Sequence, residues 1–149
     1  MELKSPVFEN GKTIPKKYGY HNGNTNPPLI IENIPGNTKS LVLIMDDPDA
    51  IKAVGKIWVH WILWNISPHT KIIDENSIPE NTLEGMNDFG EIGYGGPAPP
   101  DKEHEYIFSL YALNKTLNIK SGSSKKDVES EISDFIIEKC VLLGKYFPQ

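Results

Sequence analysis

Arginine is absent from this sequence. All 15 basic residues are lysine, against 20 acidic residues, and the formal net charge is −5. Proteins that bind nucleic acids usually carry a basic surface rich in arginine and lysine, so this composition argues against a nucleic acid as partner. It also means that an anion must be bound by backbone N–H groups, histidine, lysine or hydroxyl groups, because no guanidinium is available.

Cysteine and long apolar runs are also scarce. Cys140 is the only cysteine, which excludes an internal disulfide and a zinc site made of cysteines. No apolar run approaches a membrane span, and the first residues, Met1–Pro6, lack the apolar region of a signal peptide. We therefore expect an intracellular, cytoplasmic protein without a transmembrane segment.

Short apolar segments separated by turn residues fill most of the chain. The 149 residues are enough for one domain with its own core. Asn-Gly and Pro-Gly pairs between apolar segments favour strands at hairpin-like spacing. The polar residues 67–92 show no period and are predicted as a long connecting loop, of the kind that is usually functional. The predicted strands are Val7–Phe8, Leu29–Ile31, Ser40–Met45, Ile57–Ile66 and Tyr106–Asn114.

The segment Ile57–Ile66 is apolar on both faces, which is typical of a central strand. A single histidine on such a face is more often a buried core residue than a functional one, and both interpretations stay open for His60. Alternation predicts one face made of Trp58, His60, Ile62 and Trp64, and another made of Val59, Trp61 and Leu63.

The C-terminal part of the chain shows the spacing of an amphipathic helix. Ser124 and Asp127 resemble a capping box, and the predicted helix runs from about Lys125 to Leu143. Cys140 falls on its apolar stripe and is predicted to be a small core residue rather than a nucleophile. We therefore expect a mainly β, predominantly antiparallel domain with a C-terminal helix packed on the sheet. The stripe consists of Val128, Ile132, Phe135, Ile136, Cys140 and Leu143.

An acidic cluster follows the predicted strand Ser40–Met45. Asp46, Asp47 and Asp49 surround Pro48. Three carboxylates at a strand end repel one another unless a partner offsets them. An Asx-type turn with Pro48 at its corner would explain the same residues without any function.

A loop rich in glycine and proline leads into the predicted strand Tyr106–Asn114. Gly93–Pro100 contains three glycines and three prolines, which specify a rigid, irregular loop. Because side chains alternate along a strand, His104 and Tyr106 point to the same face, where the loop delivers the chain. This arrangement suits a small polar pocket, although a plain turn into a core strand would have the same composition.

These two motifs together resemble the signature regions of one family, the phosphatidylethanolamine-binding proteins, also called Raf-kinase-inhibitor-like proteins. The likeness is to the short bacterial and archaeal branch and covers nearly the whole chain. The first motif is Asp46-Asp47-Pro48-Asp49 followed by His60-Trp61, and the second is Gly93–Pro100 followed by His104-Glu105-Tyr106. Further matching segments are Leu3–Phe8, Ile14-Pro15, Asn26–Leu29, Ile34-Pro35, Gly85–Phe89 and Leu110–Leu113.

The resemblance implies a single β-sandwich domain over residues 1–149, without enzymatic activity, cofactor or metal. A small pocket near one end would bind phosphate-like or carboxylate anions and phospholipid head groups. The family includes inhibitors of kinases and of serine proteases, so a protein target of either kind is a further expectation, and a homodimer stays open. The implied ligand-binding residues are Asp47, Pro48, His60, Gly96, Pro97, His104 and Tyr106, supported by Asp49 and Trp61.

Three positions depart from the family pattern. Ile51 stands where proline is usual, Lys102 where glycine is frequent, and Glu105 where arginine is common. Because Glu105 replaces a cation at the pocket rim, it would weaken the attraction of anions, and its effect on affinity and partner choice stays open.

The implied pocket also makes physical sense from its residue types. The Gly96 N–H, two imidazoles and the Tyr106 hydroxyl can donate hydrogen bonds to an anion. Asp47 would repel an anion, but it fits if it accepts the second N–H of a histidine and favours the protonated ring. Loss of His60 would then leave Asp47 partly unpaired. The expected ligand is a small monoanion or a zwitterionic head group.

Two enzymatic interpretations compete with binding. Asp47, His60 and His104 have the composition of a two-histidine, one-carboxylate metal site, so a metal-dependent hydrolase is the alternative function. Against it, the sequence offers no pair of ligands on one helix. A serine hydrolase built on Ser109 is disfavoured, because alternation turns Ser109 away from His104 and Tyr106.

Overall fold

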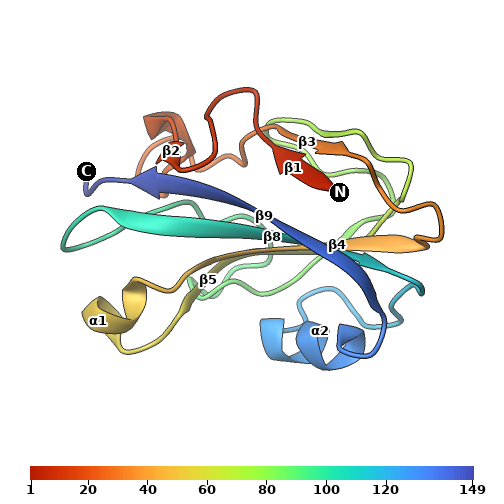
Figure 1. The fold of residues 1–149 in the computed structure, drawn as a ribbon. Coiled ribbons are helices and arrows are strands. Elements are labelled where there is room, and N and C mark those ends of the chain that lie inside the picture. Colours follow the sequence, from red (N-terminus) through yellow and green to blue (C-terminus); the bar gives the residue numbers. More distant parts are fainter.

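Two β-sheets packed face to face form the body of the protein, and two α-helices lie on the opposite side of the larger sheet (Figure 1). The computed structural model describes all 149 residues. The smaller sheet consists of β1 (Glu2–Lys4), β3 (Leu29–Glu32) and β6 (Ile72–Ile73), in the order β1-β3-β6. The larger sheet consists of β2 (Lys12–Thr13), β4 (Ser40–Asp47), β5 (Trp58–Ile66), β7 (Leu83–Glu84), β8 (His104–Leu113) and β9 (Ile136–Tyr146), in the order β2-β9-β8-β4-β5-β7. The helices are α1 (Ala50–Val54), α2 (Lys125–Ile132) and a short 3₁₀ turn, Lys16–Tyr18.

Most of the predicted strands are present. The strands predicted from Leu29, Ser40, Ile57 and Tyr106 correspond to β3, β4, β5 and β8, with ends that differ by one or two residues. All strand pairs are antiparallel except β2 and β9, which are parallel. Residues 67–92 are irregular as predicted, apart from the short strands β6 and β7. The predicted mainly antiparallel β-sandwich is therefore confirmed.

The predicted strand at Val7–Phe8 is wrong, because the chain turns there. The Ser5 hydroxyl donates to the Pro28 carbonyl at 2.7 Å and accepts the Val7 N–H at 3.3 Å, which bends the backbone. The first strand is instead β1. Phe8 is still buried, and its ring centroid lies 6.0 Å from that of Phe108.

The C-terminal helix is much shorter than the spacing predicted. α2 ends at Ile132, and the chain then forms β9, which pairs with β8 along almost its whole length. Phe135 and Ile136, which a longer helix would bury, are 37% and 41% exposed. Without β9, the edge of β8 would leave a row of backbone N–H and C=O groups unpaired, so strand pairing overrides the local helical spacing. Cys140 accordingly lies half-buried on β9, against the core between the sheets.

The predicted start of α2 is confirmed. The Asp127 N–H donates to the Ser124 hydroxyl at 3.1 Å, and the Ser124 N–H donates to the Asp127 carboxylate at 3.4 Å. Val128 and Ile132 of this helix are buried in an apolar cluster against the larger sheet. A larger apolar cluster fills the space between the two sheets. The larger sheet is therefore covered on both faces.

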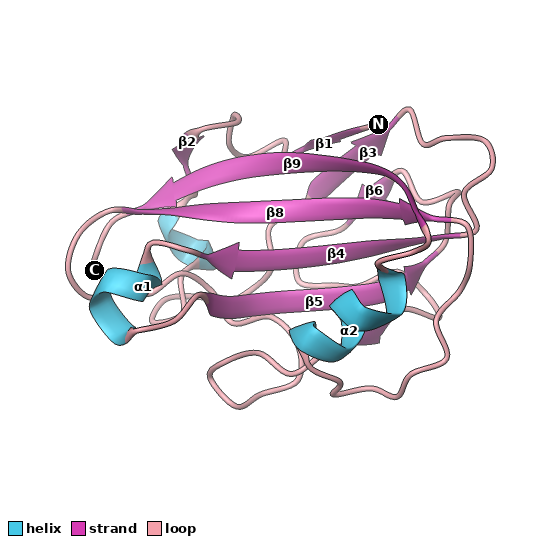
Figure 2. Ribbon diagram, turned by 60° about the horizontal axis from the view of Figure 1, so that its bottom comes forward, coloured by secondary structure: helices cyan, strands magenta, loops and turns pink.

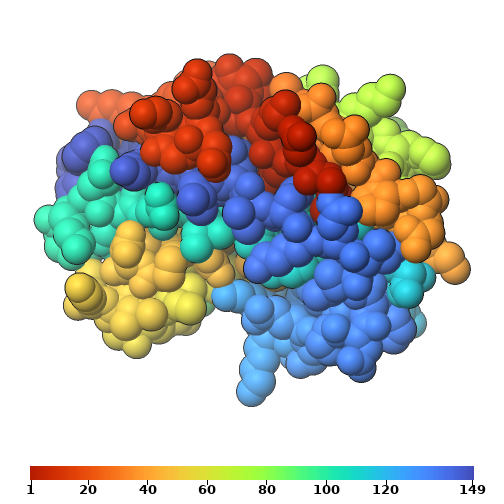
Figure 3. All heavy atoms as spheres, in the orientation of Figure 1, coloured from red at the N-terminus to blue at the C-terminus, as the bar shows by residue number.

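The segment after β4 and the segment before β8 meet at one end of the sandwich. β4 runs into α1, and the loop that ends at His104 enters β8 beside it (Figure 2). In the space-filling view, the α1 segment in yellow and the start of β8 in teal adjoin at this end (Figure 3). The fold therefore brings the two sequence motifs together.

Candidate functional site

A cavity of about 260 Å³ lies at this end of the larger sheet, between α1 and the loop before β8. Its wall includes Asp47 from the end of β4, His60 from β5, and His104 and Tyr106 from the start of β8. Four of the predicted site residues thus surround one cavity. The other lining residues are His21, Ala50, Ala53, Val54, Trp58, Phe89, Ala98 and Pro100.

A β-bulge turns His60 toward this cavity. Three residues of β5, 59–61, face only Met45 and Asp46 of β4, so His60 is the extra residue in the ladder. Strict alternation would turn His60 to the face that α2 covers, but its ring instead meets Tyr106 edge-on, with centroids 5.1 Å apart. The predicted alternation is therefore wrong at Val59, which packs on the same side as Ile62 and Trp64, and at His60, because a bulge changes the direction of a side chain.

His104 is held between two carboxylates. Its Nδ1–H donates to Asp47 Oδ2 at 2.6 Å, and its Nε2–H donates to Asp101 Oδ1 at 2.7 Å. The His104 ring is fully buried and the Asp47 side chain nearly so, whereas the Asp101 side chain is 41% exposed. Because both ring nitrogens need a proton to donate in this way, the arrangement favours the imidazolium form.

Burial and the contacts between His104, Asp47 and Asp101 explain the direction in which the pKa values of His104 and Asp47 are shifted. Burial alone would lower the pKa of His104, but the hydrogen bonds to Asp47 and Asp101 outweigh it and raise the pKa above its usual value. Burial raises the pKa of the Asp47 carboxyl, and the hydrogen bond from His104 offsets this only in part. The partner of Asp47 is thus His104, and the expectation that loss of His60 would leave Asp47 unpaired is wrong.

His60 is neutral in this site. Its Nδ1–H donates to the Gly95 carbonyl at 2.6 Å, and burial lowers the pKa of His60 to about 4. A neutral ring with its proton on Nδ1 leaves Nε2 as a hydrogen-bond acceptor. The expectation that both imidazoles donate to a ligand is therefore wrong, since His60 uses its proton on Gly95 and His104 uses both of its protons on carboxylates.

Three polar atoms on residues of the cavity wall are buried and have no hydrogen-bond partner of good geometry within the protein. They are the Tyr106 hydroxyl, the indole N–H of Trp58, and Oδ1 of Asp47. Burial and the charge of the nearby Asp47 carboxylate raise the pKa of Tyr106, so its hydroxyl keeps its proton. Residues that line the cavity therefore carry two unused donors and one unused carboxylate acceptor.

Gly96, Pro97 and Pro48 do not line the cavity. The Gly96 N–H, predicted to face a ligand, donates instead to Asn24 Oδ1 at 2.8 Å. A Cβ at Gly96 would lie 2.1 Å from the carbonyl oxygen of Tyr18, so this glycine allows a close approach of two backbones. The Pro97 carbonyl accepts the Tyr20 N–H at 2.9 Å. The Pro48 carbonyl accepts the Ile51 N–H in the turn into α1. All three residues fix the backbone of the loops around the cavity and do not contact its interior.

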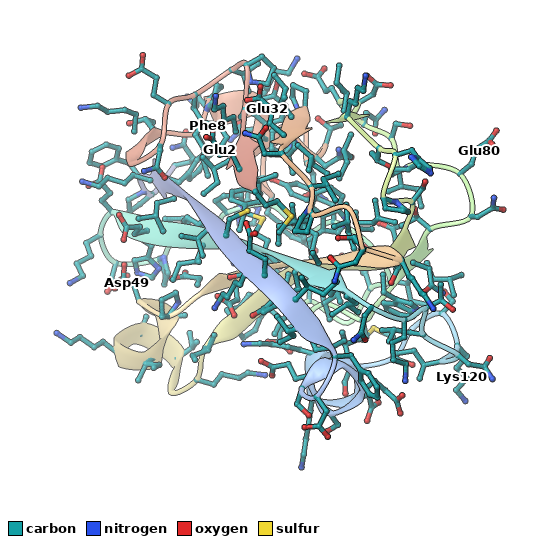
Figure 4. The ribbon with its side chains drawn as sticks, turned by 45° about the vertical axis from the view of Figure 1, so that its right-hand side comes forward. Glu2, Phe8, Glu32, Asp49, Glu80 and Lys120 are labelled. Carbon is teal, nitrogen blue, oxygen red and sulfur yellow. The ribbon has the colours of Figure 1, made fainter.

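The two residues predicted to support the site also belong to its frame. Asp49, which lies between α1 and β8 in Figure 4, accepts the Glu105 N–H at 2.9 Å and so connects the first motif to β8. Trp61 belongs to the core between the sheets, and its indole N–H donates to Glu84 at 2.9 Å. These contacts connect the segment after β4 to β8, and β5 to β7.

Sequence reasoning missed three ring side chains of the cavity wall: His21, Trp58 and Phe89. The ring of Phe89 lies edge-on to Trp58 at 5.5 Å and to His60 at 5.6 Å. The spacing of Trp58, two positions before His60, could have placed it in the site. Phe89 ends a segment that matched the family pattern but had no assigned role, and His21 had no signal in the sequence.

No three histidine, cysteine, aspartate or glutamate side chains converge in a way that could hold a metal ion. Both nitrogens of His104 contact carboxylates, and Nδ1 of His60 contacts the backbone. The two-histidine, one-carboxylate arrangement with Asp47 is therefore not formed. Ser109 does not line the cavity either.

The buried, neutral His60 should make the protein less stable in acid. Its pKa is about 4 in the folded protein and near 6.5 in the unfolded chain, so the unfolded state binds the proton first. Stability is therefore lost as the pH falls from about 6.5 to 4, by roughly 3 kcal/mol in total. Replacing His60 with asparagine, whose amide N–H can still donate to Gly95, should remove this part of the acid sensitivity.

Urea denaturation at a series of pH values measures this effect. The control is His69→Asn, which removes an exposed histidine and should keep the full loss of stability. An identical pH dependence in wild type and His60→Asn would show that His60 is not held neutral in the folded protein.

Comparisons with known proteins agree with the fold and with the two motifs. The family model for phosphatidylethanolamine-binding proteins matches residues 4–147. The chain belongs to the phosphatidylethanolamine-binding protein family. A similar sequence is a UPF0098 protein of Methanothermobacter thermautotrophicus, which is 39% identical over 151 residues, covering 98% of each chain. A UPF0098 protein of Chlamydia trachomatis is 38% identical over 148 residues, again covering 98% of each chain.

Two solved structures share this fold. A putative phosphatidylethanolamine-binding protein homologue from Chlamydia trachomatis is 38% identical, with a TM-score of 0.90, and the match covers 97% of this chain and 95% of that one. YbcL of E. coli, a member of the same family, is 28% identical, with a TM-score of 0.91 and coverage of 99% and 98%. The resemblance inferred from the two motifs is thereby confirmed.

Family membership supports a binding protein in general. The three residues of this chain that depart from the family pattern do not line the cavity. Ile51 and Lys102 are exposed, and Glu105 stands opposite Lys145 on β9. No helix of the protein has both the length and the apolar composition needed to cross a bilayer.

Proposed function

We propose that this protein is a non-enzymatic binding protein whose cavity takes a small ligand with a phosphate-type group, or with a carboxylate beside a hydrogen-bond donor, such as a phospholipid head group. The observation that carries this proposal is the set of unpaired polar atoms on Tyr106, Trp58 and Asp47. Folded proteins rarely leave buried polar groups without partners, because each unpaired group costs free energy. Three such groups around one cavity favour a polar ligand that supplies the missing hydrogen bonds.

The same atoms define what the ligand must offer. It must accept hydrogen bonds from Tyr106 and Trp58, and it must donate one to Asp47 Oδ1, with the free nitrogen of His60 as a second acceptor. A fully ionised oxyanion can accept but cannot donate. A phosphate group that keeps one proton, or a phosphate ester that carries an ammonium group, can do both. This chemistry agrees with the small monoanion or zwitterionic head group expected from the sequence.

Calorimetric titration with four compounds tests the proposal. Phosphoethanolamine and inorganic phosphate can accept and donate, whereas sulfate and acetate are fully ionised at neutral pH and only accept. We expect phosphoethanolamine and phosphate to bind, and sulfate and acetate to bind at least about tenfold more weakly, because Asp47 would then stay unpaired. Equal affinity for sulfate and phosphate, or no binding of any of the four at millimolar concentration, would contradict the proposal.

Other functional features stay predictions from the sequence. They are regulation or inhibition of a kinase or a serine protease, a homodimer, and a cytoplasmic location. The first of these would use the rim of the cavity and the neighbouring loops as a protein interface.

A further inference from the structure

The charged hydrogen-bond donor beside the cavity, the His104 ring, already donates to a carboxylate of the protein itself. The Nε2–H of His104 donates to the carboxylate of Asp101, three positions earlier in the proline-rich loop, at 2.7 Å. The His104 ring is fully buried while the Asp101 side chain is 41% exposed, so this carboxylate lies between the ring and the solvent. Asp101 itself does not line the cavity, although the neighbouring Pro100 does.

The two carboxylates on His104 differ in how firmly they are held. Asp47 ends a central strand and is 3% exposed, so its contact with the ring is part of the core. Asp101 stands in an irregular loop, and its side chain is already 41% exposed to solvent. Releasing Asp101 into water would cost little, and an external anion at Nε2 would replace one charge-assisted hydrogen bond with another.

We propose that Asp101 is an internal ligand of the pocket, which an external anion must displace to reach His104. This inference rests on the proposed binding of phosphate-type ligands. Asp101 then sets the affinity of the pocket. Only protein molecules in which the loop carrying Asp101 has moved away from His104 can offer Nε2 to the ligand. If that competent form makes up about a tenth of the molecules, the apparent affinity is about tenfold below its intrinsic value.

The variant Asp101→Ala tests this inference with phosphoethanolamine as the probe. It removes the competing carboxylate, and Nε2 of His104 becomes free to donate to the phosphate group. We expect calorimetry at fixed ionic strength to show affinity raised by about tenfold relative to wild type. The matched control is Glu103→Ala, which changes the net charge equally but whose side chain makes no hydrogen bond with His104. Its affinity should stay within about twofold of wild type, because a half-buried charge without a hydrogen bond to His104 contributes little.

A second measurement needs no ligand. The imidazole of His104 can be titrated by NMR in wild type and in Asp101→Ala, and loss of one carboxylate should lower its pKa. An unchanged pKa would mean that Asp101 does not contact the ring in solution, and it would overturn the inference.

The binding results separate the two proposals. If wild type binds phosphoethanolamine and Asp101→Ala binds it no more tightly, the internal ligand is refuted while the proposed function stands. Equal gains in Asp101→Ala and Glu103→Ala would also refute it, because they would reflect net charge alone. If neither the wild type nor either variant binds, both proposals fail.

Discussion

Replacing Tyr106 with phenylalanine is expected to weaken phosphoethanolamine binding by about tenfold to a hundredfold, the usual effect of losing one hydrogen bond to a charged group. The Tyr106 hydroxyl is buried and has no hydrogen-bond partner of good geometry within the protein, so it can donate to the ligand. For the same reason, the variant should fold with at least wild-type stability, because the unpaired hydroxyl is no longer buried. Calorimetric titration and urea denaturation of the same preparation measure both effects.

Tyr111→Phe is the matched control for this prediction. Tyr111 lies on the same strand, β8, but does not line the cavity, so the identical chemical change should leave affinity unaltered. Trp58→Phe should repeat the pattern of Tyr106→Phe, because it removes the other unused donor. A Tyr106→Phe protein that binds normally but loses stability would indicate that the hydroxyl serves the fold and not a ligand.

Replacing His104 with leucine is expected to destabilise the protein by about 3 to 5 kcal/mol at neutral pH, the usual cost of breaking a buried ion pair. Leucine has a similar size, so the main effect is the loss of the hydrogen bond to Asp47. Asp47 is 3% exposed and would be left as a buried charge without its partner. Urea denaturation measures the difference.

Two further measurements identify the cause. Adding Asp47→Asn to His104→Leu removes the stranded charge and should recover a large part of the lost stability. The deficit of the single variant should also shrink as the pH is lowered, because burial raises the pKa of Asp47 and its carboxyl then becomes neutral. His69→Leu, at an exposed position, controls for the change of residue type. A double variant no more stable than His104→Leu would assign the loss to packing instead.

The sign of the His104 contribution follows from its raised pKa. The folded protein holds the proton of His104 more tightly than the unfolded chain does. This contribution is therefore fully present below about pH 6.5, and it is lost as the pH rises through the pKa of the folded protein. His60 acts in the opposite direction, because its pKa is lowered and its contribution is lost in acid. The two histidines together favour maximal stability between these ranges.

The sequence by itself determined three of the four long strands, the start of the last helix and the two motifs of the site. The apolar segments that became β4, β5 and β8 are long enough, and bounded clearly enough, to be strands in almost any context. Ser124 and Asp127 form a cap through contacts three residues apart, which sequence alone can specify. The glycines and prolines of Gly93–Pro100 likewise act through their own backbone angles.

Only the tertiary structure decided the features that depend on contacts distant in the chain. Residues after Ile132 have helical spacing but become β9, because β8 offers them a continuous ladder of hydrogen bonds. Alternation cannot reveal the bulge at His60, since it arises from the register between β4 and β5. The partner of Asp47 was also undetermined, because two histidines of the same type were candidates. Burial and loop geometry made one of them, His60, neutral, and placed the other, His104, between two carboxylates.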